Sequence, residues 1–387
     1  MWKTKTGSKL RDSLLGALLL AAALALATLP GETSEAAREG LALCYNVVIP
    51  SLFPFFILSS LLVELGLASG LGRALEPIMR PLFGVSGAGA SALALGLVGG
   101  YPVGARTALE LYQTRQCSKE EAERLLCFCN NCGPAFLLGV VGTGVFQDPA
   151  AGLLLCAVHM GSALLTGVLF RLLRPIGKRQ RGAPPPSVVR AASAPAAFTS
   201  SIKGAFSSTL NICAFVVCFT VLLRLLTATG VLPRLAALLG GLLAPLGGSP
   251  EWALRLLGGM LELTTGVTAL AGTGQLAGRM ALASFLLGWG GLSVHCQTAA
   301  LLEGSGLRMG GCLAGKLLHG LLAGGITLAL ARTLWGKEAA AVFAPAAEPW
   351  HSGAAVANLL PITLFFTLAV TIGAIFFTFS LYRKPKV

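Results

Sequence analysis

The chain has 387 residues, of which 55% are hydrophobic and only 12% are charged, and its mean hydropathy is +0.77. This composition excludes an ordinary soluble protein and predicts that the lipid bilayer is the solvent for most of the chain. The formal net charge is +13, but the interleaved aromatic residues and soluble fold typical of a nucleic-acid-binding protein are not visible, so we expect no nucleic-acid partner.

The basic residues indicate which parts of the chain face the cytoplasm, because cytoplasmic loops of membrane proteins are enriched in Lys and Arg. They gather near the N-terminus, near the centre and near the C-terminus, and we expect all three regions to be cytoplasmic. Arg224, Arg234 and Arg255 are exceptions, since the predicted topology puts them on or near the outer side. The three groups are Lys3, Lys5, Lys9 and Arg11; Arg171, Arg174, Lys178, Arg179, Arg181 and Arg190; and Arg383, Lys384 and Lys386.

The first apolar run extends over residues 14–29 and follows the basic N-terminus. Residues 1–30 resemble a signal peptide, with Ala25-Leu26-Ala27 as a cleavage motif. We interpret them as an uncleaved first span, because the rest of the chain also stays in the membrane. The next apolar segment, 44–65, contains Pro50 and Pro54, which remove backbone donors and predict a kinked or broken helix.

Two interrupted apolar segments follow in the first half. Residues 86–111 are rich in glycine, and we predict a span whose centre, 99–105, is irregular. Residues 125–146 carry two asparagines, a glycine and a proline in their middle, at 130–134. We predict that they form a re-entrant hairpin with its polar tip at membrane depth, where irregular backbone is tolerated only if protein surrounds it. Residues 150–173 are predicted to span the membrane again.

A basic, proline-rich linker at 174–195 separates this half from a second one with the same plan. The second half has predicted spans at 204–226, 252–271 and 310–330, an amphipathic stretch at 232–246 and a predicted hairpin at 281–300. A last span is predicted at 359–381. Each half contains an odd number of crossings, so the second half is expected to insert upside down, as in many transporters.

The predicted fold class is therefore an all-α polytopic membrane protein with about eight transmembrane helices and two re-entrant hairpins in two inverted-topology repeats. The sequence leaves the oligomeric state open, because small-residue faces can pack subunits or helices of one chain. The predicted domains are an N-terminal helix and loop (1–39), a first repeat (40–173), a basic cytoplasmic linker (174–198), a second repeat (199–333), and a loop with a C-terminal helix (334–387).

The sequence shows no pattern of an enzyme or of a metal site. It contains no nucleophile elbow, no phosphate-binding glycine loop of the required spacing and no zinc motif with a histidine at ligand distance. Cys127, Cys129 and Cys132 form a cluster that would suit a metal. However, most of the ten cysteines lie in apolar runs, so we interpret them as packing residues and expect neither a metal nor a cofactor.

Interrupted helices leave backbone groups free near the middle of the membrane, where they bind solutes or ions. Glu262 lies near the middle of its predicted span, and we favour a functional role, because a carboxylate there costs several kcal/mol unless it is paired or faces a polar cavity. His295 either couples protons to transport or is satisfied by a carbonyl. Asn130 and Asn131 either bind a carboxylate or heteroaromatic ring or cap the turn. Arg106 either pairs with an anionic substrate or marks the edge of its span.

The predicted binding residues are Gly100, Tyr101, Pro102, Gly104, Arg106, Asn130, Asn131, Gly133, Glu262, Thr264, Thr265, Gly291, Ser293, His295 and Gln297.

Five motifs give the chain a resemblance to a known family. They are IPSLFPF (49–55), GGYPVGA (99–105), NNCGPAF (130–136), ELTTG (262–266) and GGLSVHCQ (290–297). With these motifs the chain resembles the sporulation integral membrane protein YlbJ family, also called SpoVV, which carries a nucleoside-recognition or Gate type of domain. The resemblance covers roughly residues 10–385, and five motifs in the family's order are a specific signal.

The resemblance implies a role in endospore formation, with passage of dipicolinic acid across the outer forespore membrane of the mother cell. The family is also similar to concentrative nucleoside transporters, whose two inverted repeats each contribute a hairpin to the substrate site. Dipicolinate has a planar ring and two carboxylates, which helix N-termini, Arg106 and the two asparagines would suit. The acidic hairpin-tip motif expected for ribose hydroxyls is not recognised in the sequence, which weakens a nucleoside as the substrate.

Three functions remain open at this point. The first is a transporter of dipicolinate in the cell membrane or outer forespore membrane, with a proton or sodium as an unassigned coupling ion. The second is a Gate-domain scaffold that recruits or regulates other sporulation proteins without transporting anything. The third is a transporter of a nucleoside or another small solute.

Overall fold

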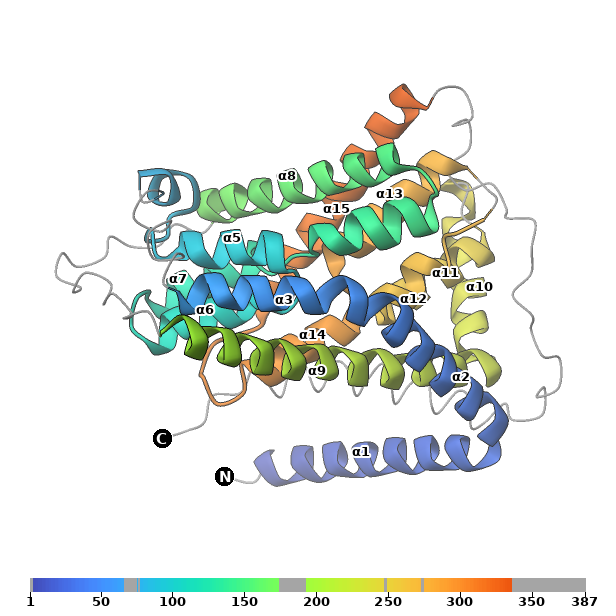
Figure 1. Cartoon of the computed structure of the whole chain (residues 1–387). Coiled ribbons are helices and arrows are strands. Elements are labelled where there is room, and N and C mark those ends of the chain that lie inside the picture. Colours follow the sequence, from blue (N-terminus) through green and yellow to red (C-terminus); the bar gives the residue numbers. More distant parts are fainter. Residues whose placement is uncertain are drawn as a thin grey trace.

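The computed structural model describes residues 3–65, 75, 77–173, 193–246, 249–272 and 275–335, and these residues form helices and loops without a strand. Most of the predicted linker and the whole predicted span at 359–381 lie outside the described residues. Figure 1 shows a bundle of helices, with the N-terminal helix α1 (Lys3–Thr28) at one side of it.

The described helices fall into a first and a second half of the chain, on either side of the linker. The first half comprises α2 (Pro30–Leu43), a π-helical turn η1 (Cys44–Val48), α3 (Ile49–Glu64), α5 (Gly89–Gly99), α6 (Val103–Gln113), α7 (Lys119–Phe128), a π-helix η2 (Phe136–Val145) and α8 (Pro149–Leu173). The second half comprises α9 (Ala194–Ala228), α10 (Val231–Leu243), a short 3-10 turn η3 (Ala244–Leu246), α11 (Pro250–Leu261), α12 (Leu263–Thr268), α13 (Leu276–Trp289), α14 (Gly291–Leu301) and α15 (Gly310–Leu334).

Three of the described helices, α8, α9 and α15, are long and apolar enough to cross a membrane by themselves. Residues 30–48 and 52–58, which are bent by 52° relative to each other, form either a fourth, broken span or a re-entrant loop. The bend confirms the break predicted from Pro50, which lies between the two parts and cannot donate a backbone hydrogen bond, whereas Pro54 lies inside α3 without ending it. The chain is therefore an integral membrane protein with an all-α fold.

The structure places the hairpins one segment earlier in each half than the sequence predicts. Helices α5 and α6 pack against each other, and α11 packs against α12. Gly96 and Gly104 face each other across the first hairpin, so that a Cβ on either would lie 3.0 Å from the Cα of the other. In the second hairpin, a Cβ on Gly266 would lie 2.7 Å from the backbone nitrogen of Gly259. The hairpins are thus residues 89–113 and 250–268.

The segments predicted as hairpins are instead helices with an interruption. Helix α7 and η2 are separated by residues 129–135, and α13 and α14 meet at Gly290, whose φ of 91° ends α13. The prediction of hairpins at 125–146 and 281–300 was therefore wrong, because composition shows where a helix breaks but not whether the chain folds back there. Within each half, one predicted crossing becomes a hairpin and one predicted hairpin becomes a crossing. The predicted number of crossings therefore stays the same. The inverted orientation of the second half stays a prediction.

The two halves are packed into each other. Helices α2 and α3 pack on α9, while α15 packs on α7, α8 and α13. Arg224 on α9 forms ion pairs with Glu32 and Glu39 on α2, at 3.3 and 2.6 Å. These pairs neutralise one of the arginines that the charge distribution left as exceptions.

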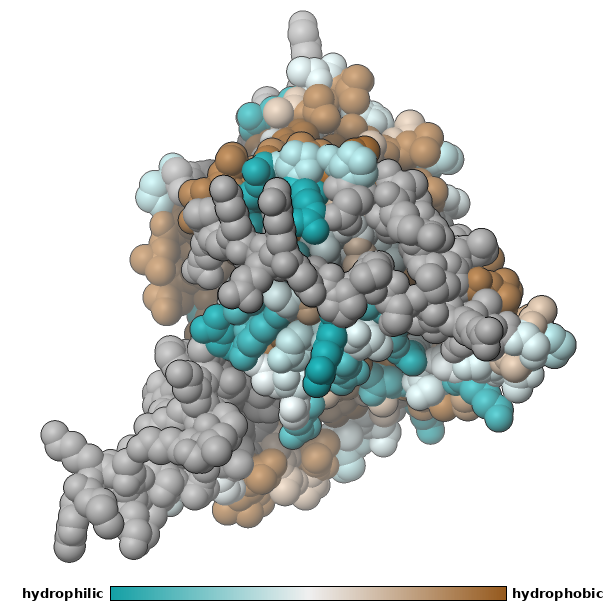
Figure 2. All heavy atoms as spheres, turned by 90° about the vertical axis from the view of Figure 1, so that its left-hand side faces the viewer, coloured by the Kyte–Doolittle hydropathy of each residue, from teal (hydrophilic) through white to brown (hydrophobic). Residues whose placement is uncertain are grey.

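Hydrophobic side chains are exposed on the outer helices, as expected for a surface that faces lipid. Examples are Leu153 and Leu165 on α8, Phe206 on α9 and Leu321 on α15. Figure 2 shows one end of the bundle, where hydrophilic side chains gather near the middle and hydrophobic ones lie toward the sides.

Candidate functional site

The tips of the two hairpins and the interruptions of the two broken helices meet inside the bundle. Gly100, at the first tip, lies against Gly133 in the first interruption, where an added Cβ would be 3.1 Å from the Gly133 nitrogen. Gly100 also has a φ of 78°, which favours glycine. At the second interruption, a Cβ on Gly291 would lie 2.9 Å from the nitrogen of Leu263, at the second tip. In both halves, therefore, the backbone of a hairpin tip lies in close contact with the backbone at the interruption of a broken helix.

Tyr101 joins the two halves at this junction. Its side chain comes from the first hairpin tip, and its hydroxyl donates a 2.9 Å hydrogen bond to the carbonyl oxygen of Leu287, in the last turn of α13. Trp289 donates a similar bond, from Nε1 to the carbonyl oxygen of Met260 near the second tip, at 3.2 Å. The two bonds fix both hairpin tips relative to the end of α13.

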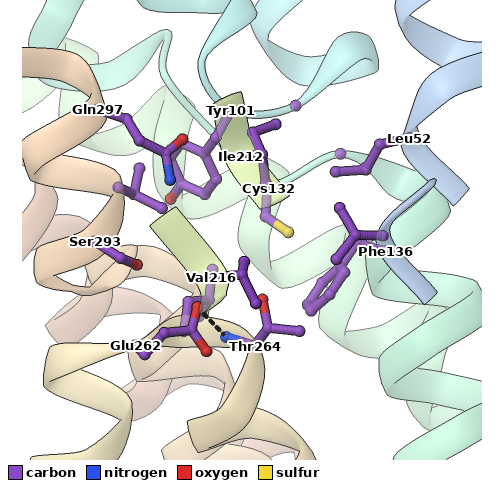
Figure 3. Close-up of a pocket in the computed structure, with 15 residues that line it drawn as sticks. Leu52, Tyr101, Cys132, Phe136, Ile212, Val216, Glu262, Thr264, Ser293 and Gln297 are labelled. Atoms are coloured by element: carbon purple, nitrogen blue, oxygen red, sulfur yellow. Dashed lines mark hydrogen bonds between the residues drawn. The ribbon is translucent and has the colours of Figure 1, made fainter. Parts of the chain in front are cut away.

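A cavity lies at this junction (Figure 3). Parts of both halves contribute to its wall: η1 and α3, both hairpin tips, the interruption before η2, α9 and α14. Its lining residues are Val48, Leu52, Gly100, Tyr101, Cys132, Gly133, Phe136, Ile212, Val216, Glu262, Leu263, Thr264, Ser293, Val294 and Gln297. Binding sites for small molecules typically contain a few polar groups in a mostly apolar wall, as this cavity does.

Glu262 is the acidic residue of the cavity. It forms the second hairpin tip and is the N-cap of α12. Its two carboxylate oxygens accept hydrogen bonds from the backbone nitrogens of Thr264 and Thr265, at 3.1 and 2.6 Å, and its side chain is 1% exposed. Figure 3 shows the carboxylate beside Thr264 at the cavity. The two N–H groups offset part of the cost of burying its charge.

The position of Glu262 corrects two statements from the sequence. Glu262 lies at a hairpin tip and not near the middle of a span, because the segment around it folds back. The first hairpin tip, at 100–102, has no acidic side chain, but the second has one. An acidic side chain is therefore present at one of the two hairpin tips.

Neutral polar groups complete the cavity wall. The Oε1 atom of Gln297 is buried and has no hydrogen-bond partner among the described residues. Ser293 lies one turn earlier on α14, and both side chains line the cavity in Figure 3. Phe136, Ile212 and Val216 supply apolar wall opposite these groups. A small ring with polar substituents would match this distribution.

The structure brings seven of the predicted binding residues to the cavity: Gly100, Tyr101, Gly133, Glu262, Thr264, Ser293 and Gln297. Four others support this region without lining the cavity. Pro102 lies in the first tip, Gly104 packs against the backbone of Cys129, Thr265 donates to Glu262, and Gly291 packs against the second tip.

The remaining four predicted residues face elsewhere. Arg106 is exposed and pairs with Glu110, one turn later on α6, at 3.3 Å. Asn130 donates to the hydroxyl of Thr298 at 3.2 Å, and Asn131 donates to the carbonyl oxygen of Phe128 at 2.7 Å. His295 packs edge-on against a tryptophan ring, with the ring centres 4.4 Å apart. In the structure the asparagines hold the interruption of α7, and Arg106 marks the surface of the bundle.

A buried polar cluster that was not predicted from the sequence lies beside the cavity. It contains His159 on α8 with Lys316 and His319 on α15, and these three side chains are at most 1% exposed. Two polar residues three positions apart in a predicted span would have been a signal for this cluster, since ionisable residues are rare in membrane helices. Cys127, Cys129 and Cys132 are buried nearby, but no three His, Cys, Asp or Glu side chains of the described part of the chain are arranged to hold a metal ion.

Comparisons with known proteins agree with this architecture. The family model Gate, described as nucleoside recognition, matches residues 46–147 and 209–300. The sporulation integral membrane protein YlbJ of Bacillus subtilis (strain 168) is 32% identical over 352 residues, which are 85% of each chain.

Solved structures of the concentrative nucleoside transporter CNTnw have a similar fold. Its outward-facing state has a TM-score of 0.51 at 18% identity and covers 86% of each chain. Its inward-facing, substrate-bound state has a TM-score of 0.52 at 16% identity and covers 87% of this chain and 88% of the other. At such identities the likeness shows the fold.

Proposed function

The chain belongs to the Gate family, described as nucleoside recognition, and is related to YlbJ, and from this premise we propose that it transports dipicolinate across the outer forespore membrane during sporulation. The protein thus acts without catalysing a reaction. The observation that supports this proposal is the cavity at the junction of two hairpin tips and two interrupted helices. Transporters with repeated, interrupted helices hold their solute at such a junction.

Sporulation is supported by the relationship to YlbJ, whose name states that role for the relative. The chemistry of the cavity supports a small planar solute. Phe136 and Tyr101 offer aromatic faces for a pyridine ring, and Ser293 and Gln297 offer hydrogen-bond donors for its carboxylates. The Lys316 ammonium lies 5.0 Å from the centre of the Tyr101 ring and brings positive charge close to the cavity.

A nucleoside is the second candidate, and Glu262 favours it. Each carboxylate oxygen already accepts one backbone hydrogen bond and keeps a lone pair for another donor. Ribose hydroxyls are such donors, whereas the carboxylates of dipicolinate are repelled by a negative charge. The negative charge of Glu262 therefore favours binding of a nucleoside and opposes binding of dipicolinate.

The proposal is tested by dipicolinate content in spores of a strain that lacks this gene. We expect low content without the gene and restored content with the wild-type gene. In proteoliposomes, labelled dipicolinate should be taken up, and an excess of unlabelled uridine should not compete. Competition by uridine would favour a nucleoside over dipicolinate as the transported solute. Normal spore content without the gene would remove the dipicolinate assignment and favour the scaffold.

The variant Gln297→Leu is expected to lower dipicolinate uptake about tenfold, because a hydrogen bond to a charged group contributes about 1.5–3 kcal/mol. The apolar side chain keeps the volume but cannot donate. Initial uptake rates in proteoliposomes measure the effect. The matched control is Gln113→Leu, since Gln113 is exposed at the end of α6; uptake should be unchanged there. Equal loss in both variants would show that Gln297 has no direct role.

A further inference from the structure

Lys316 is fully buried, although it is a charged residue in a membrane-spanning helix. Its Nζ donates a 2.9 Å hydrogen bond to the carbonyl oxygen of Asn130 and lies 3.2 Å from Nδ1 of His319. Its third neighbour is the face of the Tyr101 ring. None of the ion pairs among the described residues includes Lys316. Its partners are thus a backbone carbonyl, a histidine and an aromatic ring.

The hydrogen bonds of the two histidines determine the direction of donation. Nε2 of His319 lies 2.9 Å from the carbonyl oxygen of His159, and a carbonyl can only accept, so this nitrogen carries the proton. In the neutral ring Nδ1 is then an acceptor, and Lys316 donates to it. His159 in turn accepts at Nε2 from the backbone nitrogen of Cys132, at 3.0 Å. All of these contacts fit a protonated Lys316 that donates to a neutral His319, which in turn donates to the backbone of His159.

The carbonyl that accepts from Lys316 lies at a particular place in the fold. Helix α7 ends at Phe128 with Cys129 as its C-cap, and Asn130 is the next residue in the interruption. The C-terminus of a helix carries partial negative charge and attracts cations. In transporters with interrupted helices, carbonyls at such ends coordinate the coupling ion. Here an ammonium group of the chain itself is bound at that end.

We propose that Lys316 is a tethered cation that takes the place of a coupling sodium ion at the interruption of α7. This inference rests on the proposed transport function and adds that transport is independent of sodium. The ammonium supplies the positive charge that the carbonyl of Asn130 and the face of Tyr101 require. Because it is attached to α15, it remains in place whether or not solute occupies the cavity.

Thermal stability of the purified chain in detergent tests the ion site without any solute, so it remains informative even if dipicolinate is not the substrate. The wild-type Tm should be the same in sodium chloride as in potassium chloride of equal ionic strength. In Lys316→Ala the space left by the ammonium should bind sodium, and sodium should raise Tm by about 2 °C or more relative to potassium. Lys316→Ser, which adds a hydroxyl oxygen as a ligand, provides a second variant in case the alanine variant does not fold.

The control variant is Lys203→Ala, which removes an exposed lysine from α9 and should show no response to sodium. In proteoliposomes, replacing sodium by potassium should change wild-type dipicolinate uptake by less than about twofold, whereas coupling of ordinary strength changes affinity by roughly 5- to 150-fold. A sodium-dependent Tm or sodium-dependent uptake of the wild type would overturn the proposal. So would a folded Lys316→Ala or Lys316→Ser protein that does not respond to sodium.

Discussion

Replacing Glu262 by glutamine should lower the maximal rate of solute transport by at least about tenfold, with the protein still inserted in the membrane. Both carboxylate oxygens of Glu262 accept backbone N–H groups, from Thr264 and Thr265. A glutamine has only one oxygen, so its amide nitrogen would face one of these donors, and the second hairpin tip would lose a hydrogen bond. The tip would therefore be less well defined where it lines the cavity.

The two candidate solutes predict different outcomes for Glu262→Gln in proteoliposomes. If the solute is a nucleoside, uptake should be lost, because the charged acceptor for its hydroxyls is gone. If the solute is dipicolinate, removing the negative charge lowers the repulsion, and the apparent KM should fall while the maximal rate falls with the disordered tip. Glu303→Gln, on an exposed loop after α14, is the matched control. Unchanged uptake of both solutes in Glu262→Gln would show that this carboxylate has no part in transport.

Gly96→Ala should reduce the stability of the folded protein by about 3 kcal/mol or more, because overpacking against rigid backbone cannot be relieved by a rotamer change. A Cβ at this position would overlap the carbonyl oxygen of Cys129 and also approach Gly104 to 3.0 Å. The hairpin would have to move away from both its other arm and the interruption of α7. We expect little folded protein, measured by size-exclusion chromatography in detergent and by the Tm of the remaining material.

Gly161→Ala is the control for this experiment. Gly161 lies in α8, and no atom comes within 4 Å of an added Cβ. Alanine is favoured over glycine in a helix by about 0.5–1 kcal/mol, so the control should be as stable as the wild type or more stable. If Gly96→Ala were as stable as Gly161→Ala, the close packing of the first hairpin on residues 129–135 would be wrong.

The sequence predicts the helix breaks at Pro50, 99–105 and 130–134, because proline and glycine have strong local effects on the backbone, but it misses the break at Glu262. It does not predict which broken segment folds back. That choice depends on tertiary packing, such as the contact between Gly96 and Gly104.

The lining of the cavity could be predicted in part. Glu262 was proposed from its buried carboxylate, and Ser293 and Gln297 as members of an interrupted segment; all three line the cavity. Asn130 and Asn131 were expected either to bind the solute or to cap the turn, and in the structure their amide nitrogens donate to Thr298 and to the carbonyl oxygen of Phe128. The apolar wall, such as Ile212 on α9, could not be predicted, because an apolar residue that faces a cavity has the same composition as one that faces lipid.

The packing of α15 has a consequence for how the protein is made. Helix α15 is the last described helix, yet it is a neighbour of α7 and α8 in the first half, and its Lys316 holds the interruption after α7. During synthesis the first half therefore leaves the ribosome long before the partner that satisfies its free carbonyl exists. It has to wait in the membrane with that polar group incompletely paired, so the interruption after α7 reaches its final packing only when α15 has been inserted.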